Sequence, residues 1–256
     1  MAESHKKHLG VGIVLALSFL VVLGLIFSPI FPPDHNGKAQ NGLLFADDLF
    51  NKLSKGSSYF IPKLTASNDK FMGKTFSVSI KMSKSDDKPG QSEERTQRST
   101  QLFMINEGAN VEVQGDVLKI EGDLGKVLAA ALQDSEIMFR NEGETLKTKY
   151  GTAMKTDDIK QIYRQWHNVL SRIGKELTKA GKIEEANIVN DVTKKAIETA
   201  YNFYGVEAQK VSEKAVLMTG LLVFYVAYTL WWGFAIFYIF EGIGLSMKKA
   251  KVKKEV

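Results

Sequence analysis

The chain has 256 residues, with 34 basic and 29 acidic side chains, 44% apolar residues and no cysteine. The absence of cysteine excludes disulfides, thiolate-bound zinc, thiolate-bound iron–sulfur clusters and a cysteine nucleophile. Apolar residues are concentrated at the two ends. No charged residue lies between His8 and Asp34, and Glu241 is the only one between Lys214 and Lys248. This distribution predicts a polar region held between two membrane spans.

The first apolar run, from Leu9 to Phe31, is long enough for a helix that crosses the hydrocarbon core of a membrane. A cleaved signal peptide is the alternative, but its apolar region is usually about 7–15 residues long and ends at a small-x-small site. This run is longer and ends in Phe-Ser-Pro-Ile-Phe, which favours an uncleaved signal anchor.

The second run, from Ala215 to Met247, exceeds the length of a minimal span. It carries Trp231 and Trp232 near its middle, where an interfacial aromatic belt does not explain them. A packed helix surface would explain both residues.

The placement of lysine predicts the orientation of the two spans. Lys6 and Lys7 precede the first span, and five lysines lie between residues 248 and 254. The positive-inside rule therefore places both termini in the cytoplasm and the middle of the chain outside it, in an inner (cytoplasmic) membrane protein with two spans. The net charge of +5 then reflects topology and contact with membrane lipid, and does not indicate nucleic-acid binding.

The first part of the middle region shows both helical and strand patterns. Asn41 is placed to cap a short helix over residues 42–53. Apolar and polar residues alternate over Thr75–Met82, which predicts a half-buried strand. Lys84–Arg98 contains no large apolar residue and is expected to be an exposed, mobile loop, and Gln101–Asn106 is a second candidate strand.

Residues 110–121 predict a β-hairpin, because Gly115 and Asp116 suit a two-residue turn that places two apolar pairs on one face. Asp123 is then placed to cap a helix over residues 124–132. The pattern over residues 135–150 is ambiguous between strand and helix.

From Thr156, the predicted N-cap of a long helix, the pattern becomes helical. A narrow apolar stripe of coiled-coil type follows, made of Ile159, Ile162, Tyr163, Trp166, Leu170, Ile173 and Leu177. Gly181 interrupts it, and a second helix carries Val189, Val192, Ala196, Ala200 and Phe203 on one side. The short connection predicts an antiparallel hairpin, and Gly205 is the expected kink before the second span.

The expected fold is α+β, with two transmembrane helices flanking an extracytoplasmic α+β module that has a long membrane-proximal antiparallel helical hairpin. The expected order is a cytoplasmic tail (1–8), the first span (9–31), the α+β module (32–154), the hairpin (155–214), the second span (215–247) and a basic cytoplasmic tail (248–256).

No pattern typical of catalysis or metal binding emerges from the residues. The four histidines, at positions 5, 8, 35 and 167, show no zinc-binding spacing of the HExxH type. Gly73-Lys74-Thr75 ends like a phosphate-binding loop, but the upstream glycine is missing and a strand follows where a helix is required. No catalytic, cofactor-binding or metal-binding residue is therefore predicted, and no cofactor.

Glu241 is the one acidic residue inside a predicted span, where a charge is costly. It either reaches the membrane interface or pairs with a donor on a partner protein. Thr229-x-x-x-Gly233 and Gly12-x-x-x-Ala16 have the spacing of close helix contacts. The residues expected to contact a partner are Tyr163, Trp166, Leu170, Phe203, Trp231, Trp232 and Glu241.

These features favour a non-catalytic accessory or scaffold subunit of a membrane protein complex, whose partners are other integral membrane proteins or further copies of itself. The layout of tail, span, outer domain, second span and short basic tail resembles that of polysaccharide chain-length regulators, and this resemblance implies a ligand-binding or oligomerising alternative. Those proteins carry a proline-rich stretch at their second span, whereas all five prolines here precede residue 90. An enzyme of a kind that the residues do not identify is the third possibility, and a small-molecule ligand stays open.

Overall fold

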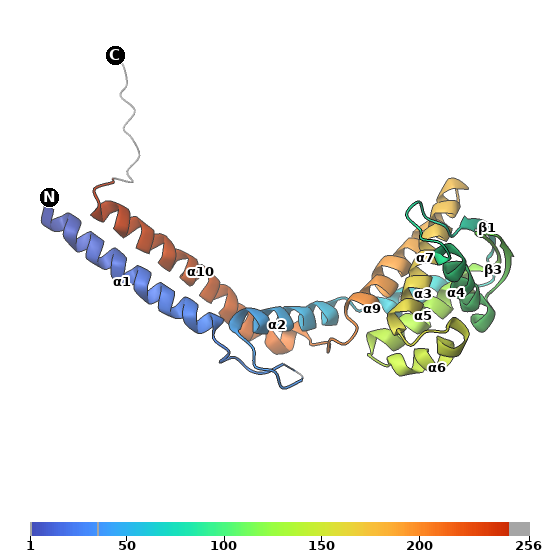
Figure 1. The fold of residues 1–256 in the computed structure, drawn as a ribbon, viewed down its shortest axis with the longest axis horizontal. Helices are drawn as coiled ribbons and strands as arrows, with labels where there is room; N and C mark the ends of the chain where they lie inside the picture. The colour runs from blue at the N-terminus through green and yellow to red at the C-terminus, as the bar shows by residue number, and fades with distance from the viewer. Residues whose placement is uncertain (1, 35, 246–256) are drawn as a thin grey trace, which may run out of the picture. The chain divides into compact units, whose positions relative to one another are not determined.

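The structure is a computed structural model that describes residues 2–34 and 36–245. The predicted basic tail at 248–256 lies outside the described residues. The chain divides into two compact units, one made of residues 54–208 and the other of residues 1–53 together with the chain from residue 209 onward. Helix and sheet are mixed, and two of the helices are long and apolar enough to cross a membrane (Figure 1).

The two membrane-length helices are α1 (Ala2–Phe27) and α10 (Val211–Gly242). Helix α1 ends four residues before the predicted limit at Phe31, because Pro29 disfavours the helical conformation of the residue before it. Helix α10 begins and ends earlier than the predicted range of 215–247.

Helices α1 and α10 pack against each other in antiparallel directions, and small residues bring their backbones close together (Figure 1). A Cβ added at Gly12 would lie 2.7 Å from the backbone nitrogen of Ile239, and one added at Gly242 would lie 2.5 Å from that of Leu9. Near the other end of the pair, the ring of Phe19 stacks on Tyr228 at 4.1 Å between centroids. Of the two small-residue spacings, the one at Gly12 therefore serves this contact, whereas Gly233 has nothing within 4 Å of an added Cβ.

Helix α2 (Gly42–Ser57) follows a loop after α1, in which Phe31 and Gln40 form an isolated antiparallel bridge. The predicted cap is confirmed, since the side-chain oxygen of Asn41 accepts a hydrogen bond from the backbone N–H of Leu44 at 2.9 Å. The helix continues four residues beyond the predicted end at Leu53, and the boundary between the two units falls within it, after Leu53.

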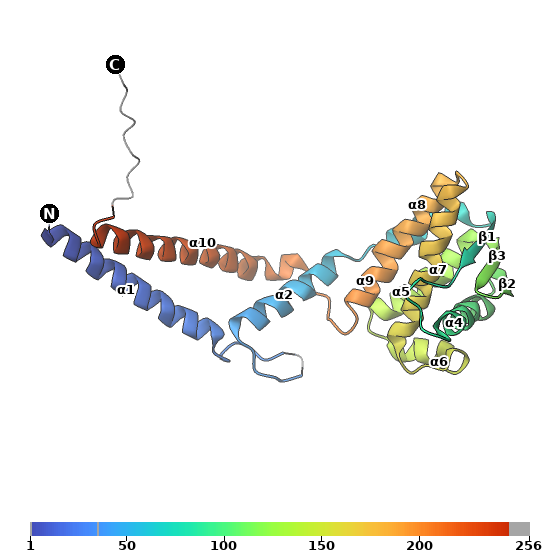
Figure 2. The same ribbon diagram turned by 45° about the horizontal axis from the view of Figure 1, so that its top comes forward.

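The unit of residues 54–208 contains a three-stranded antiparallel sheet in the order β1-β3-β2 (Figure 2). The strands are β1 (Thr75–Lys81), β2 (Ala109–Gln114) and β3 (Val117–Asp123). The predicted hairpin is confirmed with its register, because Val111 pairs with Ile120 and Val113 pairs with Leu118. Gly115 supplies the positive φ, of 62°, that the turn needs.

The rest of this unit is helical, and some of its helices pack against the sheet. In chain order the helices are α3 (Ile61–Asn68), the 3-10 turn η1 (Asp69–Phe71), α4 (Gln91–Asn106), α5 (Leu124–Phe139), α6 (Gly143–Met154), α7 (Ile159–Lys179), α8 (Ile183–Val192), the π-helical segment η2 (Thr193–Ile197) and α9 (Glu198–Asn202). One apolar core joins the sheet to the helices on both sides of residue 155, so the predicted hairpin shares its core with the α+β module.

Two sequence predictions about residues 84–106 are wrong. The expected strand at Gln101–Asn106 and half of the expected loop at Lys84–Arg98 form the single helix α4. Its buried residues are Thr96, Ser99, Leu102 and Phe103, which recur at helical spacing. Thr96 and Ser99 are small and polar, so the helical spacing of the buried residues is not visible when only large apolar residues are considered.

Residues 135–150, which were ambiguous, belong to the end of α5, a short turn and the start of α6. The predicted cap at Asp123 is confirmed, because its carboxylate accepts a hydrogen bond from the backbone N–H of Lys126. The predicted cap at Thr156 is wrong: Asp158 caps α7 and accepts from the backbone N–H of Lys160 at 2.9 Å.

Candidate functional site

Three of the residues expected to contact a partner lie in the core of the 54–208 unit. Tyr163, Trp166 and Leu170 on α7 are each at most 1% exposed. They are therefore not available to a partner in this fold, and that expectation is corrected. The apolar stripe that resembles a coiled-coil seam packs inside the unit instead. Phe203, at the end of α9, is half-buried.

A buried carboxylate explains why aromatic side chains with polar groups occupy this core. Asp134 is fully buried on α5. Its carboxylate accepts hydrogen bonds from Tyr150 Oη at 2.5 Å, from Trp166 Nε1 at 2.8 Å and from Lys149 Nζ at 2.9 Å. Its backbone carbonyl accepts one from Tyr163 Oη. Burial, and next the charge of Asp134, raise the pKa of both tyrosines. The cluster joins α5, α6 and α7.

The expected partner residues of α10 lie beside α1. Glu241 is half-buried, with its carboxylate 3.9 Å from His8 Nδ1, and its backbone carbonyl accepts a hydrogen bond from His5 Nδ1 at 2.7 Å. Trp231 is half-buried, whereas Trp232 is 40% exposed and packs its ring on Phe19 at 4.6 Å. Glu241 therefore has a neighbouring donor within its own chain.

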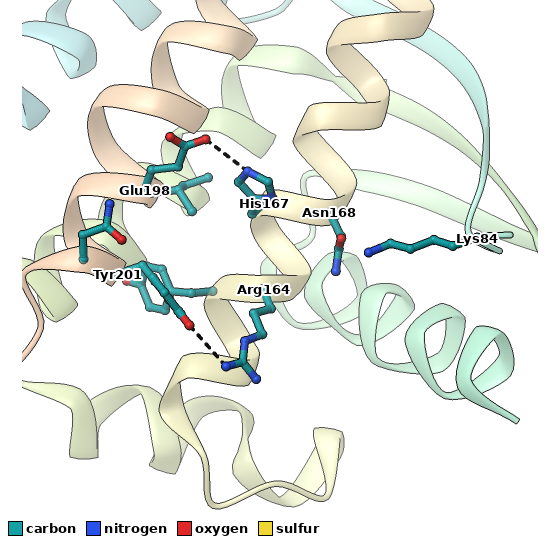
Figure 3. A pocket seen from close by; sticks show the side chains of 9 residues that line it. Lys84, Arg164, His167, Asn168, Glu198 and Tyr201 are labelled. Carbon is teal, nitrogen blue, oxygen red and sulfur yellow. Dashed lines mark hydrogen bonds and ion pairs between the residues drawn. The ribbon is translucent and has the colours of Figure 1, made fainter. Parts of the chain in front are cut away.

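A cavity of about 300 Å³ lies between α7 and α9 (Figure 3). Ile197 and Tyr163 form an apolar floor, and both are almost completely buried. The other lining residues are Lys84, Arg164, His167, Asn168, Glu198, Tyr201 and Asn202. Apart from Lys84, which lies in the loop between β1 and α4, every lining residue belongs to α7, η2 or α9.

Two polar pairs order the rim of this cavity (Figure 3). His167 Nε2 lies 3.1 Å from a carboxylate oxygen of Glu198. The guanidinium of Arg164 donates a hydrogen bond to Tyr201 Oη at 3.2 Å and lies over the tyrosine ring, 5.9 Å from its centroid. At the opposite end of the rim, the amine of Lys84 points towards Asn168 (Figure 3).

A second hollow of about 290 Å³ adjoins the first and shares Lys84, Arg164 and Asn168 with it. It adds Arg95 and Arg98, which are held by carboxylates. Arg95 forms a two-pronged ion pair with Asp87, with N–O distances of 2.5 and 2.9 Å, and Arg98 lies 2.7 Å from Glu94. Cationic groups thus gather where the two hollows meet.

The described residues contain no group of three or more histidine, aspartate or glutamate side chains that could hold a metal ion. Sequence analysis did not identify Lys84, Arg164 and Tyr201, because their spacing along the chain matches no motif and only the fold brings them together. No family model, no curated protein and no solved structure shows significant similarity to this chain.

Proposed function

We propose that the chain is a two-span membrane protein that acts as a non-catalytic accessory or scaffold subunit of a larger membrane complex. Helices α1 and α10 are its two spans, and residues 54–208 form a domain outside the cytoplasm. The lysines that flank the spans support this orientation. The partner is another integral membrane protein that contacts exposed side chains of α10.

Two polar groups near the middle of α10 carry this proposal. Tyr225 is 66% exposed and Trp232 is 40% exposed. Within the described part of the chain, neither the phenol O–H of Tyr225 nor the indole N–H of Trp232 has a hydrogen-bond acceptor. Hydrocarbon offers no acceptor either, so an unpaired donor at that depth costs free energy. A partner helix that supplies acceptors would remove this cost.

The residues around these donors fit a helix–helix contact. On α10, Thr229 lies between the two donors and Gly233 directly follows Trp232. Nothing lies within 4 Å of a Cβ added at Gly233. Small residues allow a second helix to approach the backbone closely. Helix α1 already packs against α10 at Ile239 and Gly242, and the described residues contain no third helix long and apolar enough to cross a membrane. The approaching helix therefore belongs to another chain.

The test is the purification of the tagged full chain from its native membrane in mild detergent, followed by native mass determination. We expect a stoichiometric complex with other membrane proteins. A Tyr225→Phe/Trp232→Phe double variant keeps an aromatic ring at both positions but removes both donors, and it should lose the partner. Hydrogen bonds between membrane helices are worth about 0.6–2 kcal/mol each, so the loss of two should weaken the complex strongly.

The matched control is the Leu230→Phe/Phe234→Leu double variant, which exchanges two exposed apolar side chains of the same helix and removes no donor. It should retain the partner. Recovery of a lone monomer from the wild-type membrane would contradict the proposal. A large ring of identical chains would favour the alternative function, that of a chain-length regulator that acts through oligomerisation.

A further inference from the structure

The cavity between α7 and α9 has an apolar floor and a cationic rim, and the proposed partner contact does not use it. We infer that this cavity binds a small organic anion. Its carboxylate or phosphate group lies between Lys84 and Arg164, and its apolar body packs on Ile197 and the ring of Tyr201.

The charges of Lys84 and Arg164 are poorly neutralised. Among the residues that the structure describes, no carboxylate oxygen lies within 4.0 Å of the Lys84 amine. Arg164 lies 3.9 Å from Asp158, and both side chains are about half exposed, so this pair is weak. The guanidinium of Arg164 donates its hydrogen bond, at 3.2 Å, to the phenol oxygen of Tyr201 and not to a carboxylate. An anion would therefore meet one cation without a carboxylate within 4.0 Å, Lys84, and one that is only weakly paired, Arg164.

The neighbouring arginines contrast with these two. Arg95 and Arg98 each have a close carboxylate partner, Asp87 and Glu94 respectively. Arg172, which is more deeply placed, has its pKa lowered by burial and next by the nearby charge of Arg95. The side chains of Lys84, Arg95, Arg98 and Arg164 line the two hollows, and positive charge gathered in this way concentrates anions.

An irregular helix shapes the apolar wall. Residues Thr193–Ile197 form a π-helical segment, and the backbone N–H of Glu198 donates to the carbonyl of Thr193, five residues earlier. The extra residue in this turn changes the register, so that Ile197 faces the core at 1% exposure while Glu198 and Tyr201 reach the rim. Single π-turns inside helices are rare and frequently occur at functional sites.

The size of the cavity limits the ligand. Its volume of about 300 Å³ lies at the lower end of the range of about 300–1,000 Å³ that is typical of small-molecule sites. A molecule with one ring, or a short branched chain, and one anionic group fits these dimensions. A polymer would have to use the surface beyond the cavity.

The test uses the full chain in lipid nanodiscs and 4-(trifluoromethyl)benzoate as the probe, with binding followed by fluorine NMR line broadening. Empty nanodiscs measure the partition of the probe into lipid. We expect saturable binding to the protein with a Kd below about 1 mM. The neutral amide of the probe should bind at least about tenfold more weakly, because it lacks the charge-assisted hydrogen bonds.

The variants Lys84→Gln and Arg164→Gln should each weaken binding of the benzoate by about tenfold or more and leave the amide unaffected. Lys179→Gln is the matched control, because Lys179 lies on the same helix as Arg164 and pairs with Glu176 at 2.7 Å, outside the cavity. It should bind like the wild type. Equal affinity of the wild type and both cavity variants, or no saturable binding of the benzoate, would overturn the inference. Neither result depends on whether a partner subunit co-purifies.

Discussion

Asp134 places a carboxylate in the core of the 54–208 unit, where an unpaired charge would be very costly. Its cost is offset because Tyr150, Trp166 and Lys149 all donate to it. The same contacts satisfy the donors. Tyr150 and Trp166 are buried together with their O–H and N–H groups, and both groups donate to Asp134. The aromatic residues of α7 are thus positioned by one acidic side chain, and they contribute to a single arrangement of α5, α6 and α7.

The tyrosines of this cluster make the stability of the unit fall in alkaline solution. Their pKa values are raised in the folded state, by burial first and by Asp134 next, above the ordinary value of 10.0. Both contributions are therefore complete below pH 10 and are lost as the pH rises further, because the unfolded chain releases these protons first. We expect each tyrosine to lower the free energy of unfolding by about 1 kcal/mol between pH 10 and 11.

Urea unfolding of the full chain at a series of pH values, followed by tryptophan fluorescence, measures this effect. A Tyr150→Phe variant should lose about half of the pH-dependent fall that the two tyrosines cause. Tyr201→Phe is the control, since Tyr201 lies at the cavity rim and outside the Asp134 cluster. An unchanged slope in Tyr150→Phe would show that the phenol of Tyr150 ionises equally in the folded and unfolded chains.

Among the helices and strands, the sequence correctly predicted those for which two independent features of the sequence indicate the same structure. In the hairpin of β2 and β3, the turn residues and the apolar alternation specify the same register, and the structure has it. Helix α4 was missed because two of its four buried residues, Thr96 and Ser99, are small and polar. Thr96 Oγ1 bonds to the carbonyl of Ser92, and Ser99 Oγ bonds to Gln165, so both are satisfied inside the fold.

The cavity could not be predicted from the sequence for a related reason. The π-turn at Thr193–Ile197 depends on how α8 and α9 pack on α5 and α7, and no residue type marks it in the sequence. Lys84 and Arg164 are 80 positions apart and meet only through the loop after β1. Local patterns carry no information about such a pair.

The contact between α1 and α10 depends on glycine at two positions, Gly12 on α1 and Gly242 on α10. A side chain at Gly12 would meet the backbone of Ile239, which cannot move without displacing α10. We expect Gly12→Leu to destabilise the helix pair by about 1–3 kcal/mol, as overpacking does elsewhere. Gly10→Leu is the matched control on the same helix, because a Cβ there meets nothing within 4 Å.

The measurement is the thermal loss of the folded full chain in detergent, read by size-exclusion chromatography after heating. The midpoint temperature of Gly12→Leu should fall, whereas that of Gly10→Leu should stay at the wild-type value. If both variants melt together with the wild type, the close approach at Gly12 does not contribute to stability.

At the scale of the whole molecule, the chain crosses between the two units twice, at residues 53–54 and 208–209. Lys55 lies next to the first crossing, and its buried amine donates to the carbonyl of Val206 at 2.6 Å, next to the second. Asn141 Oδ1 and the carbonyl of Phe203 are its other acceptors. Burial without a carboxylate partner lowers the pKa of Lys55. This one side chain thus ties together both ends of the 54–208 unit.

The proposed topology can be tested directly because the natural chain has no cysteine. Single cysteines introduced as Ser85→Cys, at an exposed position of the 54–208 unit, and as Ser4→Cys, before the first span, give one reporter on each predicted side. In intact spheroplasts, a membrane-impermeant maleimide should label Ser85→Cys fully. Ser4→Cys should react only after the membrane is permeabilised, because Lys6 and Lys7 hold that end in the cytoplasm.

The cysteine-free wild type is the background control, and full labelling of both variants after solubilisation shows that each thiol is reactive. If only Ser4→Cys were labelled in intact spheroplasts, the orientation would be the opposite of the proposed one, with residues 54–208 in the cytoplasm. The small anion inferred for the cavity would then come from the cytoplasm. The proposed contact of α10 with a partner would be unaffected, because that contact would lie within the membrane in both orientations. The labelling pattern therefore determines which compartment supplies the ligand, independently of whether the partner is found.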